Sequence, residues 1–132
     1  MPIPFSDERD LSNVPAALER SNVQLLIASD TPLLYFRNKE IVDAAARRRL
    51  PVVYAFREAV ENGGLMALST DLQELARRAP TYVDRILHGA RPGQLPVEQP
   101  TKLQFVINMK TAKALGVTIP PAMVLRADHV IE

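Results

Sequence analysis

The sequence predicts an α/β protein with a mainly parallel sheet. Strand-like and helix-like segments alternate along its 132 residues, which is the order that builds a parallel sheet with covering helices. Hydrophobic residues make up 47% of the chain and charged residues only 23%, so the chain can bury a core. No internal repeat or low-complexity tract interrupts the alternation.

The first half of the chain predicts two strands, each followed by a helix. A helix is expected over residues 10–21, with Pro15 in its first turn. The apolar run 25–28 favours a buried strand, and Asn38 is a suitable N-cap for the helix that follows. Pro51 then opens a strand over 52–55, and a short helical stretch over 58–62 ends at Gly63. The apolar face of the middle helix is expected to carry Ile41, Val42, Ala45 and Ala46, with arginines 47–49 in its last turn.

The second half begins with an extended piece at 65–68 and the longest helix. Residues 70–73, Thr-Asp-Leu-Gln, predict a capping box at its start, and apolar residues recur at helical spacing down to Gly89. Because Pro80 removes one backbone hydrogen bond, we expect a kink between residues 76 and 80. A Pro-rich extended connector over 90–101 leads to a strand at 103–107. Asn108 is expected to cap a helix that ends at Gly116, and residues 128–132 close as an extended tail.

Charge and composition exclude several classes of function. Sixteen basic and fifteen acidic residues leave a net charge of +1, which gives no strong attraction to nucleic acid or an anionic membrane. The absence of cysteine excludes disulfides, thiolate catalysis and cysteine-based zinc sites. No apolar run approaches the roughly 20 residues that cross a bilayer, and the first ten residues lack a signal-peptide pattern. As written, the sequence predicts a cytoplasmic chain.

Three segments carry a family resemblance. They are RLPVVYAFREAVENGGLMAL at 49–68, TYVDRILHGARPGQLPVEQPTK at 81–102 and FVINMKTAKALGVTIPP at 105–121. Together with the strand, helix, double proline and final strand of residues 95–132, they resemble substrate-binding proteins of ABC transporters, specifically the tryptophan/tyrosine-binding receptors. The resemblance implies the type I periplasmic-binding-protein fold, in which two doubly wound α/β lobes joined by a three-segment hinge hold a solute between them. It also implies a periplasmic location, a membrane permease as partner, no catalysis and no cofactor.

Proteins of that family are substantially longer, so the sequence resembles their C-terminal portion only. On this interpretation residues 1–63 are part of the second lobe. Residues 64–100 cross the hinge and supply a long first-lobe-type helix and a connector, and residues 101–132 return to the second lobe. The helix over 71–88 would then lack its partner, and we expect a homo-oligomer, or a contact with another chain, through its apolar stripe of Leu72, Leu75, Val83 and Ile86.

The first candidate solute-binding loop follows the strand at 25–28. Ligands of open α/β sheets bind beyond the carboxyl ends of the strands, which directs attention to Ser29, Asp30 and Thr31. The resemblance implies that Asp30 and Thr31 anchor an amine or a hydroxyl of the solute. The alternative is that Asp30 caps the turn before Pro32.

The second candidate loop follows the strand at 52–55 and contains Tyr54, Phe56, Arg57 and Glu58. The relatives tend to have acidic residues where this sequence has Phe56 and Arg57. An aromatic ring and a cation suit a flat or anionic solute, whereas the alternative places Phe56 in the core and Arg57 in solvent.

No constellation of residues predicts an enzyme or a metal site. His88 ends a helix and His129 has no ligand-type neighbours, so neither predicts a triad or a zinc site. Asp30 lacks the partner residues of a phosphoacceptor domain. The sequence therefore predicts non-catalytic capture of a small organic solute, such as an aromatic compound or an amino acid, for an ABC importer. One alternative is an autonomous ligand-sensing or protein-interaction domain derived from the same fold. Another is a truncated product that binds nothing because half of its cleft is missing.

Overall fold

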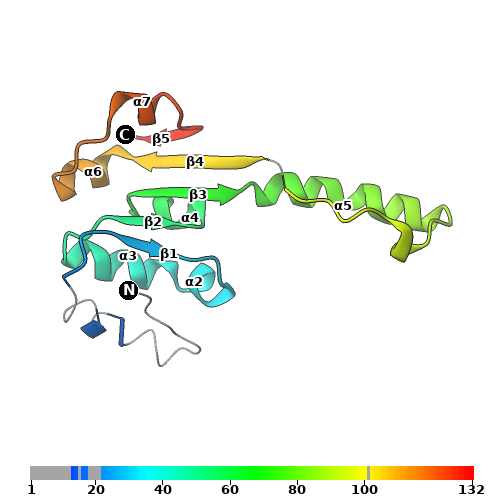
Figure 1. Cartoon of the computed structure of the whole chain (residues 1–132), viewed down its shortest axis with the longest axis horizontal. Helices are drawn as coiled ribbons and strands as arrows, with labels where there is room; N and C mark the ends of the chain where they lie inside the picture. Colours follow the sequence, from blue (N-terminus) through cyan, green and yellow to red (C-terminus); the bar gives the residue numbers. More distant parts are fainter. Residues whose placement is uncertain (1–12, 15, 18–21, 101) are drawn as a thin grey trace.

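Five strands form one sheet in chain order, β1-β2-β3-β4-β5 (Figure 1). The computed structural model describes residues 13, 14, 16, 17, 22–100 and 102–132. β1 (Leu26–Ala28), β2 (Val52–Tyr54) and β3 (Met66–Thr70) are parallel, β4 (Leu103–Asn108) is antiparallel to β3, and β5 (His129–Ile131) is parallel to β4. Parallel pairing thus dominates, which confirms the predicted α/β class.

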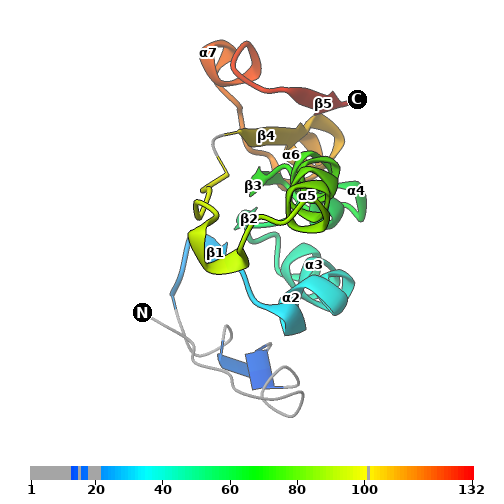
Figure 2. The same cartoon turned by 90° about the vertical axis from the view of Figure 1, so that its right-hand side faces the viewer.

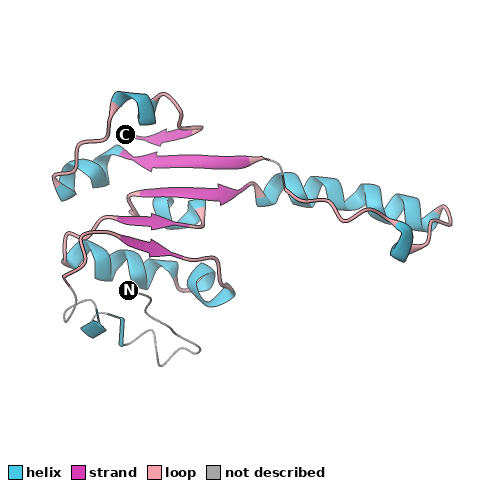
Figure 3. Cartoon of the chain, viewed as in Figure 1, coloured by secondary structure: helices cyan, strands magenta, loops and turns pink. Residues whose placement is uncertain are grey.

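Helices fill each connection between strands (Figure 3). α2 (Pro32–Phe36) and α3 (Asn38–Arg47) follow β1, and α4 (Arg57–Glu61) follows β2. α5 (Leu72–Leu87) and the 3-10 turn η1 (Pro92–Gln94) separate β3 from β4. α6 (Met109–Leu115) and α7 (Pro121–Val124) separate β4 from β5. The helix predicted over 10–21 falls mostly outside the described residues.

Two apolar clusters hold the sheet to its helices on opposite faces. The larger cluster joins α3 and α4 to one face of the sheet, through Val52, Val60, Ala67 and Val106, all of them buried. The second gathers around Ile107, which is fully buried under the segment that contains Ile119 and α7. The view along the strands shows α3 and α4 on one side and α7 on the other (Figure 2). Helices on both faces agree with the doubly wound arrangement.

Several predicted helix starts need correction. Asn38 is not an N-cap, because it lies inside α3 and its side chain donates to the Tyr35 carbonyl at 2.6 Å. The capping box at 70–73 is also wrong, since Thr70 ends β3 and Asp71 caps α5 by accepting from the Glu74 amide at 2.9 Å. In α3, Ala44 is buried in place of the predicted Ala46, which is exposed.

Other boundaries follow the predictions. Asn108 caps α6 by accepting from the Thr111 amide, and Gly116 ends it with a positive φ of 72°. Gly63 also has a positive φ, 103°, just after α4. α2 was not predicted, and the connector after α5 contains a helical turn where a fully extended chain was expected.

α5 forms an arm that extends away from the sheet, and the connector of residues 90–100 runs back beside it (Figure 1). No residue of α5 is buried. The helix continues through Pro80 to Leu87, and the predicted kink stays a prediction. The arm is therefore joined to the sheet by β3 and β4 only, with its apolar residues largely outside the core. No helix in the described part of the chain is both long enough and apolar enough to cross a membrane.

Candidate functional site

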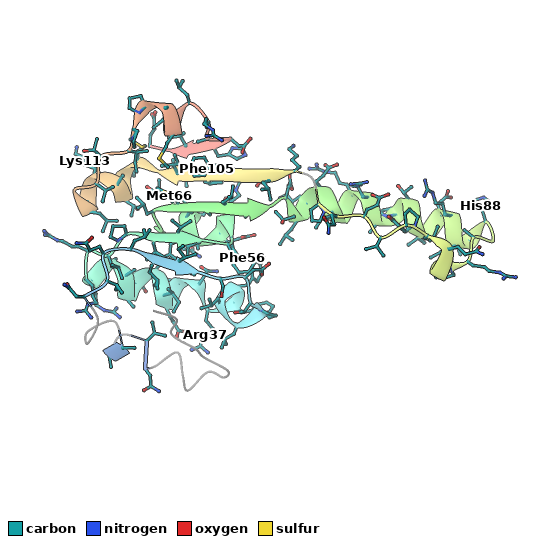
Figure 4. All side chains as sticks on the ribbon, viewed as in Figure 1. Arg37, Phe56, Met66, His88, Phe105 and Lys113 are labelled. Atoms are coloured by element: carbon teal, nitrogen blue, oxygen red, sulfur yellow. The ribbon has the colours of Figure 1, made fainter. Side chains whose placement is uncertain are left out.

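The carboxyl ends of β1, β2 and β3 meet the beginning of β4 at one edge of the sheet. This follows from the pairing, because the first three strands are parallel and β4 runs against them. The arm leaves the sheet from the same edge, and Phe56 lies there below the start of α5 (Figure 4). The predicted loops 29–31 and 54–58 are thus brought to a common edge together with residues 69–73.

The first predicted loop is exposed and partly structural. Ser29 and Asp30 are exposed, and the Thr31 hydroxyl accepts a hydrogen bond from the Leu34 amide at 3.2 Å. Thr31 is therefore the N-cap of α2, with Pro32 in its first turn. Capping is done by Thr31 and not, as the alternative interpretation had it, by Asp30.

An aromatic cluster lies beside the second predicted loop. The Tyr35 ring packs edge-to-face on Phe56, with ring centroids 4.8 Å apart, and on Phe36 at 5.4 Å. The Tyr35 hydroxyl donates to Glu58 at 3.4 Å, and the negative charge of Glu58 is the main reason why the pKa of Tyr35 is raised. Phe36 is 79% exposed. Phe56, Tyr35 and Phe36, the aromatic ladder, give the edge a surface suited to packing against a flat ring.

Tyr54 lies in the core, and Arg57 already has a partner within the protein. Tyr54 is buried in the larger core cluster, and this burial raises the pKa of its hydroxyl. Arg57 is part-exposed, and its Nε donates to Glu61 at 2.7 Å. The guanidinium has five N–H donors, so this pair leaves other donors of Arg57 for a ligand.

A small pocket opens between the second predicted loop and the start of the arm. Its volume is about 50 Å³, and Ser69 and Gln104, paired in the register of β3 and β4, lie in its wall. We call it the edge pocket. Its lining consists of Phe56, Arg57, Glu58, Ser69, Thr70, Asp71, Leu72, Gln73 and Gln104.

Asp71 organises the edge pocket. Its carboxylate accepts from the Glu74 amide and from Gln104 Nε2, both at 2.9 Å, and lies 4.0 Å from Lys102 Nζ. These contacts, with the Glu74 amide as the largest, lower the pKa of Asp71 in spite of its burial. Asp71 therefore ties the start of α5 to β4, the strand that returns from the arm.

Ser69 is the unusual member of the edge pocket. Its side chain is only 5% exposed, and its hydroxyl has no hydrogen-bond partner among the described residues. A buried hydroxyl without a partner is costly, so its retention calls for an explanation. Sequence reasoning missed Ser69, Gln104, Asp71, Tyr35 and Phe36 as site residues, and the polar run after β3, Ser-Thr-Asp, was the one local signal for some of them.

A larger hollow lies on the arm, away from this edge. It has a volume of about 510 Å³ and is lined by α5 and the connector, mainly with apolar side chains such as Leu75, Ile86 and Leu95. Tyr82 donates its hydroxyl to the Pro96 carbonyl at 3.0 Å, and Arg78 pairs with Glu98, which fixes the connector against the helix. We call it the arm groove. Its apolar lining suits packing better than the orientation of a polar solute.

No group of three His, Asp or Glu side chains in the described ranges could hold a metal ion. His88 lies at the far end of the arm, where its Nδ1 is 2.9 Å from the Asp84 carbonyl oxygen (Figure 4). The ring therefore stays at the C-terminus of α5, as predicted.

Comparison with known proteins decides the family. A sequence model described as ABC transporter substrate binding protein matches residues 5–131. The chain belongs to the ABC transporter substrate-binding protein family. It is accordingly non-catalytic, and its mainly parallel sheet matches part of the longer solved structures described next. No curated protein matches the sequence.

Solved structures agree with this assignment. A conserved domain protein from Vibrio cholerae is 30% identical, with a TM-score of 0.83 over 91% of this chain. An ABC domain from Streptococcus pneumonia in complex with L-Trp is 24% identical, with a TM-score of 0.82 over 92% of the chain, and shows the fold alone. A ligand-free, open substrate-binding protein with adhesive properties from Clostridium difficile is 20% identical over 92%, with a TM-score of 0.64. The chain spans 40%, 42% and 41% of the lengths of those three proteins, in that order.

Proposed function

We propose that this chain forms one wall of the solute site of an ABC importer and takes part in the non-catalytic capture of a small organic solute. The observation that carries the proposal is the edge of the sheet, where the aromatic ladder and the edge pocket lie next to each other through Phe56. A flat apolar group can pack on the rings while a polar end reaches the pocket. An aromatic compound or an amino acid fits this combination.

The predicted site residues remain part of this proposal. Phe56, Arg57 and Glu58 line the edge pocket, and Ser29 and Asp30 are exposed beside the same edge. Thr31 and Tyr54 would act indirectly, the first by starting α2, which carries Tyr35 and Phe36, and the second by supporting the loop after β2. The S. pneumonia protein that shares the fold holds L-Trp, which supports an aromatic amino acid as the first solute to try.

The lobe assignment is a second part of the proposal. Residues 1–63 and 101–132 would belong to one lobe, and residues 64–100 would cross the hinge and serve the other. The sheet supports one part of this division, since β4 and β5 share a sheet with β1 and β2, whereas α5 and the connector stand apart from it. The start of the range 64–100 does not fit, because β3 at residues 66–70 is the central strand of that sheet and pairs with both β2 and β4. In a complete receptor we expect a membrane permease as partner and a periplasmic location.

The exposed apolar residues of α5 favour self-association of the chain. Leu72, Val83 and Ile86 are 49%, 55% and 40% exposed, and a helix of this length seldom leaves such a stripe uncovered in water. We therefore expect a homo-oligomer through the arm. Light scattering at micromolar concentration tests it, and a strictly monomeric species would overturn it.

Solute capture can be tested with the fluorescence of the ligand, because the chain contains no tryptophan. L-Trp titrated with the 132-residue protein should show a saturable blue shift as its indole leaves water. Phe56→Ala should remove the shift, and Leu125→Ala, which truncates an 87% exposed side chain on another part of the molecule, should not. A panel of L-Tyr and aromatic acids in competition would then rank the solutes. If no member of the panel binds and Phe56→Ala is silent, the proposed capture function is wrong for this chain.

A further inference from the structure

The edge pocket contains an unused hydrogen-bonding group that the proposed function alone does not explain. Ser69 is 5% exposed, and no described residue pairs with its hydroxyl. Such a group normally finds a partner when a protein folds. Because Ser69 lines a pocket of about 50 Å³, the missing partner can be a small group that enters from outside.

The pocket also lies at the N-terminus of α5, a helix of 16 residues. The first amides of a helix have no partner within it, and the aligned peptide dipoles favour negative charge at this end. Asp71 takes up the Glu74 amide, which leaves the amides of Leu72 and Gln73 at the lining of the pocket. Leu72, Gln73, Ser69 and Arg57, the residues that carry these donors, all line the same small space.

Two carboxylates in the lining oppose an anion, and both have partners of their own. Asp71 accepts two hydrogen bonds and lies 4.0 Å from Lys102 Nζ. Glu58 accepts from Tyr35, on the side of the aromatic ladder. Glu61, outside the lining, accepts from one edge of Arg57 only. Each carboxylate of the lining therefore has at least one donor of its own, whereas several donors of the lining have no acceptor within the described part of the chain.

We infer that the edge pocket is the subsite for a carboxylate group of the solute, with Ser69, the first amides of α5 and Arg57 as its donors. The inference rests on the proposed solute capture and adds the chemical class of the solute's polar end. A volume of about 50 Å³ holds a carboxylate but not a whole amino acid or ring. The apolar part of such a solute then lies outside the pocket, next to Phe56.

Three probes that share a ring and a chain separate this inference from its alternatives. They are 3-phenylpropionate, 3-phenyl-1-propanol and 3-phenylpropylamine, which carry an anionic, a neutral and a cationic end. Each is titrated at pH 7 into the 15N-labelled 132-residue protein, and binding is followed through backbone amide shifts. The propionate should bind most tightly and should shift the amides of residues 69, 72 and 73. The alcohol should shift chiefly the loop at Phe56.

Three variants test the assigned donors. Ser69→Ala should lower the affinity for 3-phenylpropionate several-fold and leave the affinity for the alcohol unchanged. The control Thr118→Ala removes an exposed hydroxyl between α6 and α7 and should change neither affinity. Asp71→Asn keeps a residue that can cap α5 and removes a negative charge that repels the carboxylate of the probe. The affinity for 3-phenylpropionate should therefore rise about fivefold. If Ser69 and Asp71 served only to hold the fold, the two substitutions would not change the affinity for the propionate in opposite directions.

The possible results test the carboxylate subsite separately from solute binding at the edge of the sheet. Equal or tighter binding of the amine or the alcohol at residues 69–73, or an unchanged affinity of Ser69→Ala for the propionate, overturns the carboxylate subsite while solute binding at the edge stands. If none of the three probes shifts the Phe56 loop or the pocket, both the subsite and the proposed capture at this edge are wrong.

Discussion

Replacing Gly64 by alanine should strain the junction between α4 and the core beneath the candidate site. A Cβ added at Gly64 would lie 2.6 Å from Cε2 of Tyr54 and 2.7 Å from the Ala59 carbonyl oxygen. Both distances are shorter than any ordinary contact, and the second neighbour is backbone, which cannot move aside as a side chain can. The Gly64 amide also donates to that same Ala59 oxygen at 2.8 Å, which holds it in place. The small size of Gly64 is therefore required by its surroundings.

The cost follows from overpacking. Forcing a methyl group into a packed core typically costs about 1–3 kcal/mol, and two such contacts, one of them to backbone, place Gly64→Ala near the upper end, at about 2–3 kcal/mol. Gly93→Ala is the matched control, because a Cβ there has no neighbour within 4 Å and no positive φ opposes it. We expect it to be neutral or slightly stabilising. Urea denaturation with equal m-values for the three proteins measures the difference.

The result that refutes this reasoning is a Gly64→Ala protein within about 0.5 kcal/mol of Gly93→Ala, since even the low end of the overpacking range exceeds that difference. The double variant Gly64→Ala with Tyr54→Leu removes the contact with the ring and keeps the contact with the Ala59 carbonyl. A partial recovery of stability in it would show how much of the strain comes from each contact. Tyr54 ends β2 just before Phe56, so a displaced ring should also weaken solute binding at the loop.

Three further predictions concern polar groups. Ser69→Ala removes a buried hydroxyl without a described partner, so denaturation should show unchanged stability or a gain of about 1 kcal/mol, and a clear loss would mean that the hydroxyl is paired. Asn108→Ala removes a donor to the Val60 carbonyl and the cap of α6, and should cost about 2–3 kcal/mol by the same measurement, whereas a cost below about 1 kcal/mol would contradict it. The folded-state pKa of Asp71 lies below its ordinary value, so its stabilising contacts are complete above the unfolded-state pKa and are lost as the pH falls through the folded-state value. Hydrogen exchange at the Glu74 amide should accordingly gain an acid-dependent opening as the pH falls below the ordinary pKa of an aspartate, and this opening should be absent in Asp71→Asn; equal profiles would contradict the assignment.

The strands and the α/β class could be predicted because their signal is local. The run before Ser29 and the run after Pro51 are short, apolar and bounded by turn residues, and each became a strand with its end within a residue or two. α2 escaped because five residues are too few to show a helical period. Its signal was the pair Thr31-Pro32, a cap followed by a residue suited to the first turn, and this pair was taken for a loop.

The candidate site was predictable only where it follows a strand in the sequence. Phe56 and Arg57 come directly after β2, so the rule for the carboxyl ends of parallel strands placed them at the edge. Gln104 could not be found in this way, because it reaches the edge only through the antiparallel return of β4, which pairs it with Ser69 across the whole length of the arm. A contact set by strand pairing over such a distance leaves no local pattern.

The arm also shows what a local sequence pattern does not contain. Helical spacing in α5 specifies which side chains share a face, and it does so correctly, but it carries no information on what covers that face. In the structure the connector covers part of it, since Tyr82 holds Pro96 and Arg78 holds Glu98, and leaves Leu72, Val83 and Leu87 exposed. The connector therefore packs against the side of α5 that lines the arm groove. An amphipathic helix that lies outside the core and is covered on one side only has little packing of its own to stabilise it. We propose that a second copy covers the remaining residues and supplies much of the stability of the arm. Truncating Leu72 or Val83 should then affect association before it affects the fold of the sheet.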